Sequence, residues 1–230
     1  MEKTNNSDVV VIIATINEEY GIGPTILELR SILNDPEVLV IDGRSIDRTV
    51  EIAKNMDVDV LLQTGKGKGR AIGQGIRQLN SDSRYVVFID ADLTYPAEYV
   101  PKMIEILESD ANVGMVIGNR FDKMFEFEDA IGNAFYLGNR LLAFAQHFFN
   151  GIKLQDPLSG LRVVRWEILK DWKPKSKGFD VEAEMNFHVE RKGYKIVEIP
   201  IVYRSRVGEK KLKLRHGFTI LKRIVTESLS

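Results

Sequence analysis

The first half of the chain alternates short, continuously apolar runs with segments whose apolar residues recur every three or four positions. The apolar runs are rich in β-branched residues and predict strands at residues 9–15, 38–42, 58–63, 85–90 and 113–119. A strand without polar alternation must be covered on both faces, which is typical of parallel sheets. Strands and helices in alternation therefore predict a doubly wound, mostly parallel α/β sheet.

The composition sets broad limits on the function. The 230 residues carry a net charge of −1, which provides no overall attraction to nucleic acid. The absence of cysteine excludes disulfides and cysteine-based metal or nucleophile chemistry. No Pro-rich or Ser-rich linker divides the chain, so we expect a single domain over residues 1–230.

The two ends of the chain bear on its location. The N-terminal residues do not resemble a signal peptide, and no stretch reaches the ~18 apolar residues needed to span a bilayer. We therefore expect a cytoplasmic protein. Residues 204–223 contain eight Lys or Arg and one acidic residue, and residues 207–230 predict a basic amphipathic segment. This segment either binds the cytoplasmic face of a membrane peripherally or packs on its own domain.

Polar side chains follow the predicted strands at the points where these strands end. The carboxyl ends of parallel strands meet at one edge of the sheet, which is where such folds bind ligands. We therefore expect the following side chains to form one site: Thr15, Asn17, Glu18, Asp42, the loop GKGKGR at 65–70, Asp90, Asp92, Asn119 and Arg120.

Asp90 and Asp92 predict a metal site. In an extended segment, residues two apart point to the same side, and two carboxylates beside open positions suit Mg²⁺ or Mn²⁺. The alternative is that Asp92 only favours the N-terminus of the helix at Pro96 while Asp90 caps a turn. In the loop at 65–70, glycines would let backbone N–H groups approach a phosphate and Lys68 would add charge. A flexible surface turn is the alternative for that loop.

Nine blocks of sequence resemble the family 2 glycosyltransferases, and specifically the dolichyl-phosphate mannose and dolichyl-phosphate glucose synthases. The resemblance runs from Val9 to Leu214. It implies a GT-A fold that binds a UDP- or GDP-sugar through Mg²⁺ or Mn²⁺. It also implies transfer of mannose, glucose or GlcNAc, with inversion, to a dolichyl or polyprenyl phosphate. The blocks are IIATINEE, VIDGRSIDRT, GKGKGRAI, DADLTYP, GNRF, DPLSGLR, GFDVEAEM, GYKIVEIPI and RVGEKKL.

The resemblance also implies roles for individual residues, with the donor bound by residues 1–120 and the acceptor by residues 121–206. The residues implied to bind the donor are Thr15, Glu18, Asp42, Lys68, Asp90, Asp92, Arg206 and Lys211. The metal would be held by Asp90 and Asp92. The residues implied to act in catalysis are Asp92, Arg120, Arg162 and Glu184. Those implied to bind the acceptor are Arg120, Arg140, Ser159 and Arg162. Either Arg204 or Arg206 could be the arginine that holds the diphosphate.

Other interpretations remain open from the sequence. A sugar-hydroxyl acceptor would need a general base, for which Asp156 or Glu184 are candidates. A sugar nucleotidyltransferase and a receiver-like nucleotide or metal-binding module are further alternatives. Phe148 and Phe149 are expected in the core by helical periodicity, with contact to a lipid acceptor as the alternative.

Overall fold

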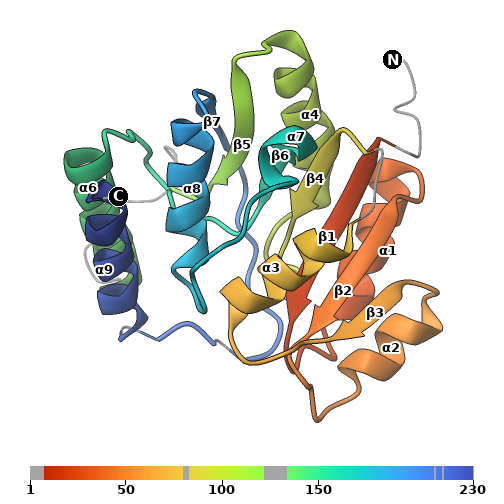
Figure 1. The fold of residues 1–230 in the computed structure, drawn as a ribbon. Helices are drawn as coiled ribbons and strands as arrows, with labels where there is room; N and C mark the ends of the chain where they lie inside the picture. Colours follow the sequence, from red (N-terminus) through yellow and green to blue (C-terminus); the bar gives the residue numbers. More distant parts are fainter. Residues whose placement is uncertain (1–7, 80–82, 122–133, 210, 214, 230) are drawn as a thin grey trace.

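The computed structural model describes residues 8–79, 83–121, 134–209, 211–213 and 215–229. Within these residues seven strands form one sheet in the order β3-β2-β1-β4-β6-β5-β7 (Figure 1). The strands are β1 (Val9–Thr15), β2 (Glu37–Asp42), β3 (Asp59–Leu62), β4 (Tyr85–Phe88), β5 (Val113–Asn119), β6 (Arg162–Arg165) and β7 (Lys195–Pro200).

The described helices connect and flank these strands. In chain order they are α1 (Ile22–Leu33), α2 (Thr49–Asn55), α3 (Lys68–Gln78), the 3₁₀ helix η1 (Ala97–Tyr99), α4 (Val100–Ser109), α6 (Ala134–Asn150), α7 (Trp166–Leu169), α8 (Val181–Arg191) and α9 (His216–Ser228).

The sheet is mostly parallel, as predicted. Strand β1 pairs in parallel with β2 and β4, β2 with β3, and β5 with β7. Strand β6 is the exception, because it runs antiparallel to both neighbours, β4 and β5. The sheet is therefore mixed, and its reversed strand comes from the second half of the chain.

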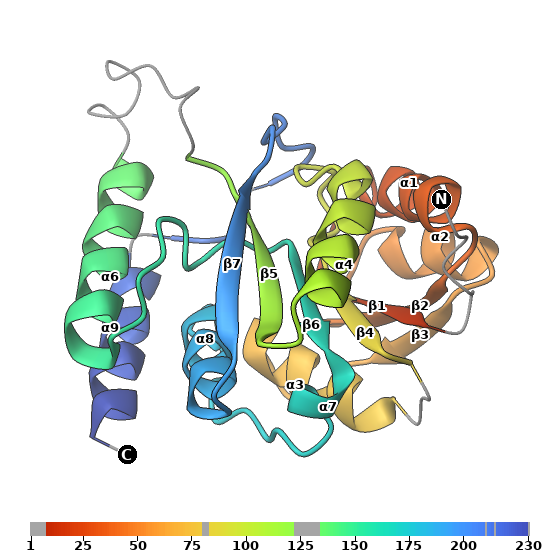
Figure 2. The same cartoon turned by 90° about the horizontal axis from the view of Figure 1, so that it is seen from above.

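Alternate residues of each strand feed two cores on opposite faces of the sheet. Val11 and Ile13 of β1 pack with α1 and α4, whereas Val10 and Ile12 pack with α3, α7 and α8. Figure 2 shows the resulting layers, with helices on both faces of the sheet. The continuous apolar character of the strands follows from this double coverage.

Helices α6 and α9 pack against each other at one edge of the molecule (Figures 1 and 2). Their contact buries Leu142, Ala145, Ile220 and Ile224. The expectation that Phe148 and Phe149 lie in the core is wrong, because 71% and 42% of their surfaces are exposed. Among the described residues no helix has the length and apolarity to cross a membrane.

Candidate functional site

A cavity of about 900 Å³ opens at the carboxyl ends of β1 and β4. Its wall combines strand ends from the first half of the chain with segments from the second half. The charged and hydroxyl side chains predicted for donor binding or catalysis that line it are Thr15, Glu18, Lys68, Asp90, Asp92, Arg120, Arg206 and Lys211.

Arg206 joins two carboxylates of this wall. Its Nη1 atom donates to Oδ2 of Asp92 at 2.5 Å, and its Nη2 atom donates to Oε1 of Glu18. Lys211 lies beside this pair, with its Nζ atom 3.1 Å from the backbone oxygen of Asn17. The segment after β7 therefore brings two cations onto the end of β1.

Arg204, by contrast, is turned away from the cavity. Its guanidinium pairs with Glu28 at 2.6 Å, and it is not part of the cavity wall. Of the two arginines between which the sequence left the choice open, only Arg206 therefore lines the cavity.

The carboxylates in this wall are crowded. Burial raises the pKa of Glu18 to about 7, although Arg206 and Lys211 act in the opposite direction. Burial and the neighbouring Asp90 also raise the pKa of Asp92. A cation that approached these carboxylates would favour their ionised form.

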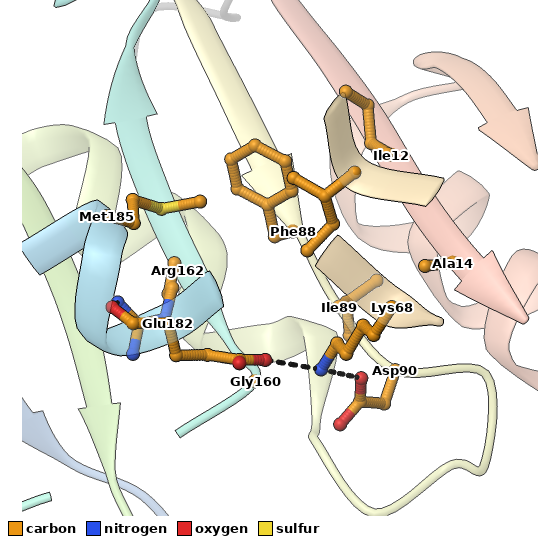
Figure 3. Close-up of a pocket in the computed structure, with 11 residues that line it drawn as sticks. Ile12, Ala14, Lys68, Phe88, Ile89, Asp90, Gly160, Arg162, Glu182 and Met185 are labelled. Carbon is orange, nitrogen blue, oxygen red and sulfur yellow. Dashed lines mark hydrogen bonds and ion pairs between the residues drawn. The ribbon is translucent and has the colours of Figure 1, made fainter. Parts of the chain in front are cut away.

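Lys68 forms ion pairs with two carboxylates, those of Asp90 and of Glu182 in helix α8. Its Nζ atom lies 2.7 Å from Oδ1 of Asp90 and 2.7 Å from Oε1 of Glu182 (Figure 3). Burial opposes ionisation of Asp90, but Lys68 more than offsets it and lowers the pKa of this carboxyl. Lys68 therefore holds Asp90 ionised, and it is itself only 15% exposed.

Glu182 is a residue of the site that the sequence reasoning missed. The block GFDVEAEM offers two glutamates, and the reasoning selected Glu184. Two residues apart on a helix are about 200° apart around its axis, so only one of them can face the cavity. The carboxylate of Glu184 instead accepts the backbone N–H groups of Lys175 and Ser176, each at 2.7 Å.

Two glycines of the loop at 65–70 have a packing role, and Gly65, Lys66 and Gly67 of this loop also line the cavity. A Cβ atom on Gly67 would lie 2.2 Å from the backbone oxygen of Lys177, and one on Gly69 would lie 2.5 Å from that of Ser176. Gly69 also donates its N–H to the oxygen of Gly178 at 3.1 Å. The loop is thus fastened to the segment before α8, which sets the position of Lys68.

Asp90 and Asp92 reach the cavity by a different backbone path from the one predicted. Strand β4 ends at Phe88, and residues 91–92 form a turn. Leu93 follows with a φ of 60°. The expected extended segment is therefore wrong, because pairing with β6 stops at Phe88. Both carboxylates nevertheless line the cavity.

Several predicted residues lie outside the described cavity wall. Arg162 is 1% exposed, and its guanidinium donates to the oxygens of Ser159 and Pro157 and to Oδ1 of Asn186, at 2.5–2.8 Å. Asp42 is fully buried and accepts the N–H of Ser45 at 2.8 Å. These two side chains hold the framework behind the wall. The other predicted residues outside the wall are Arg140, which is exposed, and Ser159 and Glu184, which are buried.

Arg120 does line the cavity, in a fixed position. Its Nε and Nη2 atoms each lie 2.7 Å from an oxygen of Asp156, which is fully buried. Its guanidinium also lies over the rings of Phe121 and Tyr203, at 5.1 and 5.4 Å from their centroids. Arg120 is thus a pre-organised cation on the side of the cavity opposite the β1 end.

The described side chains of the cavity do not by themselves supply a complete set of ligands for a divalent ion. Among the described residues no group of three acidic, His or Cys side chains has the arrangement of a complete metal site. Mg²⁺ and Mn²⁺ sites in nucleotide-binding proteins need one or two carboxylates and take the remaining oxygens from water and phosphate. Asp90 and Asp92 meet that requirement, and the buried Oε2 atom of Glu18 has no hydrogen-bond partner among the described residues.

Comparison with known proteins assigns this chain to a family. Residues 10–172 match the model of "Glycosyl transferase family 2". The chain belongs to glycosyl transferase family 2. A "Dolichyl-phosphate hexose transferase" of Haloferax volcanii is 36% identical over 208 residues, which cover 89% of this chain and 86% of that protein.

Two further matches place this family 2 chain among known sequences and folds. A "Dolichol-phosphate mannosyltransferase" of Pyrococcus furiosus is 30% identical over 93% of the chain, which spans 64% of that protein's length. The crystal structure of glucosyl-3-phosphoglycerate synthase from Mycobacterium tuberculosis with Mn²⁺, UDP and product superposes with a TM-score of 0.73. That match is 23% identical and covers 96% of this chain and 78% of the other. The expected GT-A fold is confirmed.

Proposed function

We propose that this family 2 glycosyltransferase moves a hexose, with inversion, from a nucleoside diphosphate sugar to a polyprenyl phosphate such as dolichyl phosphate. The observation that carries the proposal is the charge arrangement of the cavity. Carboxylates from the ends of β1 and β4 face cations from the segment after β7. The names of the relatives in Haloferax volcanii and Pyrococcus furiosus support a lipid phosphate as acceptor.

On the donor side, the nucleoside would lie along the end of β1. The buried Oγ1 atom of Thr15 has no hydrogen-bond partner among the described residues, so it is available to a ligand. Arg206 and Lys211 would bind the diphosphate, since guanidinium and ammonium groups stabilise the charge that develops on a phosphate leaving group. The donor would thus be bound by strand ends within the first 120 residues together with Arg206 and Lys211 from the segment after β7.

Asp90 and Asp92 would hold Mg²⁺ or Mn²⁺ together with the diphosphate. A divalent ion would there stabilise the charge of the departing nucleoside diphosphate. The ion pair of Lys68 with Asp90 keeps one carboxylate ionised and in place. The Mn²⁺ and UDP bound to the Mycobacterium tuberculosis synthase are in keeping with this role.

On the acceptor side, a phosphate monoester is mostly ionised near neutral pH and can attack the anomeric carbon without a strong general base. Arg120 would bind this phosphate, because it is a pre-organised cation in the cavity wall. A sugar-hydroxyl acceptor is less well supported. Of its two candidate bases, Asp156 is paired with Arg120 and Glu184 is bonded to the backbone of Lys175 and Ser176.

The proposal is tested by incubating the protein with UDP- and GDP-linked mannose, glucose and GlcNAc, dolichyl phosphate, and Mg²⁺ or Mn²⁺. We expect a lipid-linked sugar with one donor, and loss of the product with EDTA or in Asp92→Asn. Transfer to a free sugar hydroxyl but never to the lipid phosphate would contradict the acceptor assignment. Equal rates for wild type and Asp92→Asn would contradict the metal assignment.

A further inference from the structure

Helix α6 buries two polar side chains and exposes a row of large apolar ones. On its inner face Asn139 and Gln146 are 5% and 1% exposed. On its outer face Leu141, Phe144 and Phe148 are 63%, 66% and 71% exposed. A surface helix of a water-soluble protein normally turns its apolar face inward and its polar face outward. We therefore expect the outer face of α6 to contact an apolar environment.

The inner polar residues fix the helix in this rotation. Gln146 donates to the backbone oxygen of Ala183 at 3.0 Å and accepts from Asn186 at 3.0 Å. Asn139 donates to the backbone oxygen of Gln155 at 3.3 Å. Turning the phenylalanines inward would break these buried hydrogen bonds, and each group left without a partner would cost about 1–3 kcal/mol. The exposure of the apolar face is thus built into the fold.

We name the four exposed residues Leu137, Leu141, Phe144 and Phe148 the outer stripe. Their spacing of four, three and four residues places them on one side of the helix. The rings of Phe144 and Phe148 stack with centroids 6.2 Å apart and an interplanar angle of 20°. The stripe is therefore a continuous ridge of large apolar side chains rather than a set of scattered ones.

Among the described residues of α6 and α9, the exposed charged side chains are basic. Residues 134–150 contain no Asp or Glu. In α9, which packs on α6, the single acid is Glu227; it is 8% exposed and paired with Arg223 at 3.2 Å. The described exposed cations of this helix pair and of the segment that leads into α9 are Arg140, Lys213, Arg215 and Lys222.

We propose that the outer stripe of α6 inserts into the surface of an anionic lipid membrane, with the cations of α6 and α9 binding the headgroups. Large apolar side chains flanked by Lys and Arg are the features of helices that lie in a membrane interface. The partner is a membrane rather than a second copy of this chain, because a symmetric contact would bring the same cations together. The proposal agrees with the proposed lipid acceptor but rests on the surfaces of α6 and α9, not on the acceptor assignment.

This assignment moves the membrane contact away from the residues expected from the sequence. The C-terminal segment was the candidate, with Phe218, Leu221 and Val225 as its stripe. In α9 only Phe218 of these three is exposed, whereas Leu221 and Val225 are half-buried. Helix α9 uses its apolar residues mainly to pack against α6, so its contribution to the membrane is its charge.

The proposal has a consequence for the cavity. Gly138, Asn139 and Leu142 of α6 and Ile220 of α9 line it. Insertion of the outer stripe would therefore bring this wall of the cavity close to the lipid surface. A phosphate on a membrane-embedded chain would then reach Arg120 without leaving the membrane completely.

The first test measures flotation with vesicles of phosphatidylcholine, with and without phosphatidylglycerol. We expect wild type to bind the anionic vesicles and the double variant Phe144→Ser with Phe148→Ser to bind at least about tenfold more weakly. The matched control is Leu27→Ser, because Leu27 lies on α1 and is 61% exposed, close to the value for Leu141. Equal loss of binding in the control, or no loss in the double variant, would overturn the proposal.

The second test separates α6 from α9. Tryptophan is introduced as Phe148→Trp or Phe218→Trp, and its quenching by brominated lipids is compared with that of wild type. Strong added quenching at position 148 supports insertion of α6. Quenching at position 218 alone would assign the contact to α9 and overturn the proposal, as would a dimer in sedimentation that the double variant abolishes.

The third measurement distinguishes this proposal from the proposed function. In detergent, with a short-chain polyprenyl phosphate, the double variant is expected to keep wild-type activity because neither phenylalanine lines the cavity. Absence of activity in both proteins, with vesicle binding intact, would contradict the acceptor assignment while supporting the membrane contact. Loss of activity in the double variant alone, with an unchanged Tm, would contradict the role given to the outer stripe.

Discussion

Arg206 contacts Asp92 and Glu18, two carboxylates that are 74 positions apart in the chain, and it stands where a bound cation would also be attracted. The identities of these residues were expected from the sequence, but their pairing was not. The separation between Arg206 and Glu18 is 188 positions, and no local pattern reports a contact at that distance. No local pattern reports the contact between Lys68 and Glu182 either.

The first prediction concerns Arg206 and uses Arg204 as its matched control. Arg206→Gln removes a charge-assisted contact to the diphosphate, so we expect binding of UDP or GDP with Mn²⁺ to weaken by about tenfold or more. Without nucleotide, the same variant should bind Mn²⁺ more tightly, because Asp92 loses a competing cation. Calorimetry and the electron paramagnetic resonance of Mn²⁺ measure the two effects.

Arg204→Gln should change neither binding constant, since its partner Glu28 lies outside the cavity wall. Equal effects of the two variants would show that net charge, rather than the contact of Arg206, governs binding.

The second prediction concerns Arg162, which was expected to act in catalysis. The structure surrounds its guanidinium with protein oxygens, so Arg162→Met would leave several buried acceptors without a donor. We expect the free energy of unfolding to fall by about 3 kcal/mol or more, as measured by urea denaturation. A variant with unchanged stability and no activity would instead support direct participation in the reaction.

At the scale of elements, the ends of the strands determine which loops meet. The loop at 65–70 is held against the segment before α8 by close backbone contacts at Gly67 and Gly69. The sequence predicted a phosphate cradle in this loop, which stays a prediction, and the packing contacts were not foreseen because glycines have the same appearance in both roles. Only the neighbouring backbone distinguishes a glycine that approaches a ligand from one that approaches another loop.

The third prediction tests this loop. In Gly69→Ala the new methyl group would meet the backbone of Ser176, so we expect a loss of about 1–3 kcal/mol in unfolding free energy and weaker donor binding as Lys68 shifts. The control is Gly138→Ala in α6, where nothing lies within 4 Å of the new methyl group. It should gain up to about 1 kcal/mol, because alanine favours helix. A Gly69→Ala protein as stable as wild type would contradict the packing role.

At the scale of the whole molecule, the cavity forms because the segment after β7 packs against the ends of β1 and β4. The segment after β7 crosses the sheet edge, where the N–H of Val207 donates to the backbone oxygen of Asp92 at 3.3 Å. Donor and metal would therefore bridge parts of the fold that are distant in sequence. Ligands that bind only the folded state stabilise it by an amount set by their concentration and affinity.

The fourth prediction follows from this linkage. At about 100 times its dissociation constant, a nucleoside diphosphate with Mn²⁺ should stabilise the fold by about 2.7 kcal/mol. For a chain of this size, that corresponds to an increase in Tm of about 5–10 °C. EDTA should remove the increase, and so should Asp92→Asn. An increase in Tm with nucleotide that is insensitive to EDTA would indicate binding without the metal.

The sequence was sufficient for strands β1 to β5, the doubly wound arrangement and the family, because hydrophobic periodicity and short motifs are local properties that a single chain displays directly. It also indicated the sheet edge at which the cavity lies, since strand direction determines which ends of the strands meet there. It was not sufficient for the reversed strand β6, the choice of Arg206 over Arg204 or of Glu182 over Glu184, or the exposed face of α6. Each of these depends on which partner a side chain meets across the fold, and long-range packing and ion pairing select that partner.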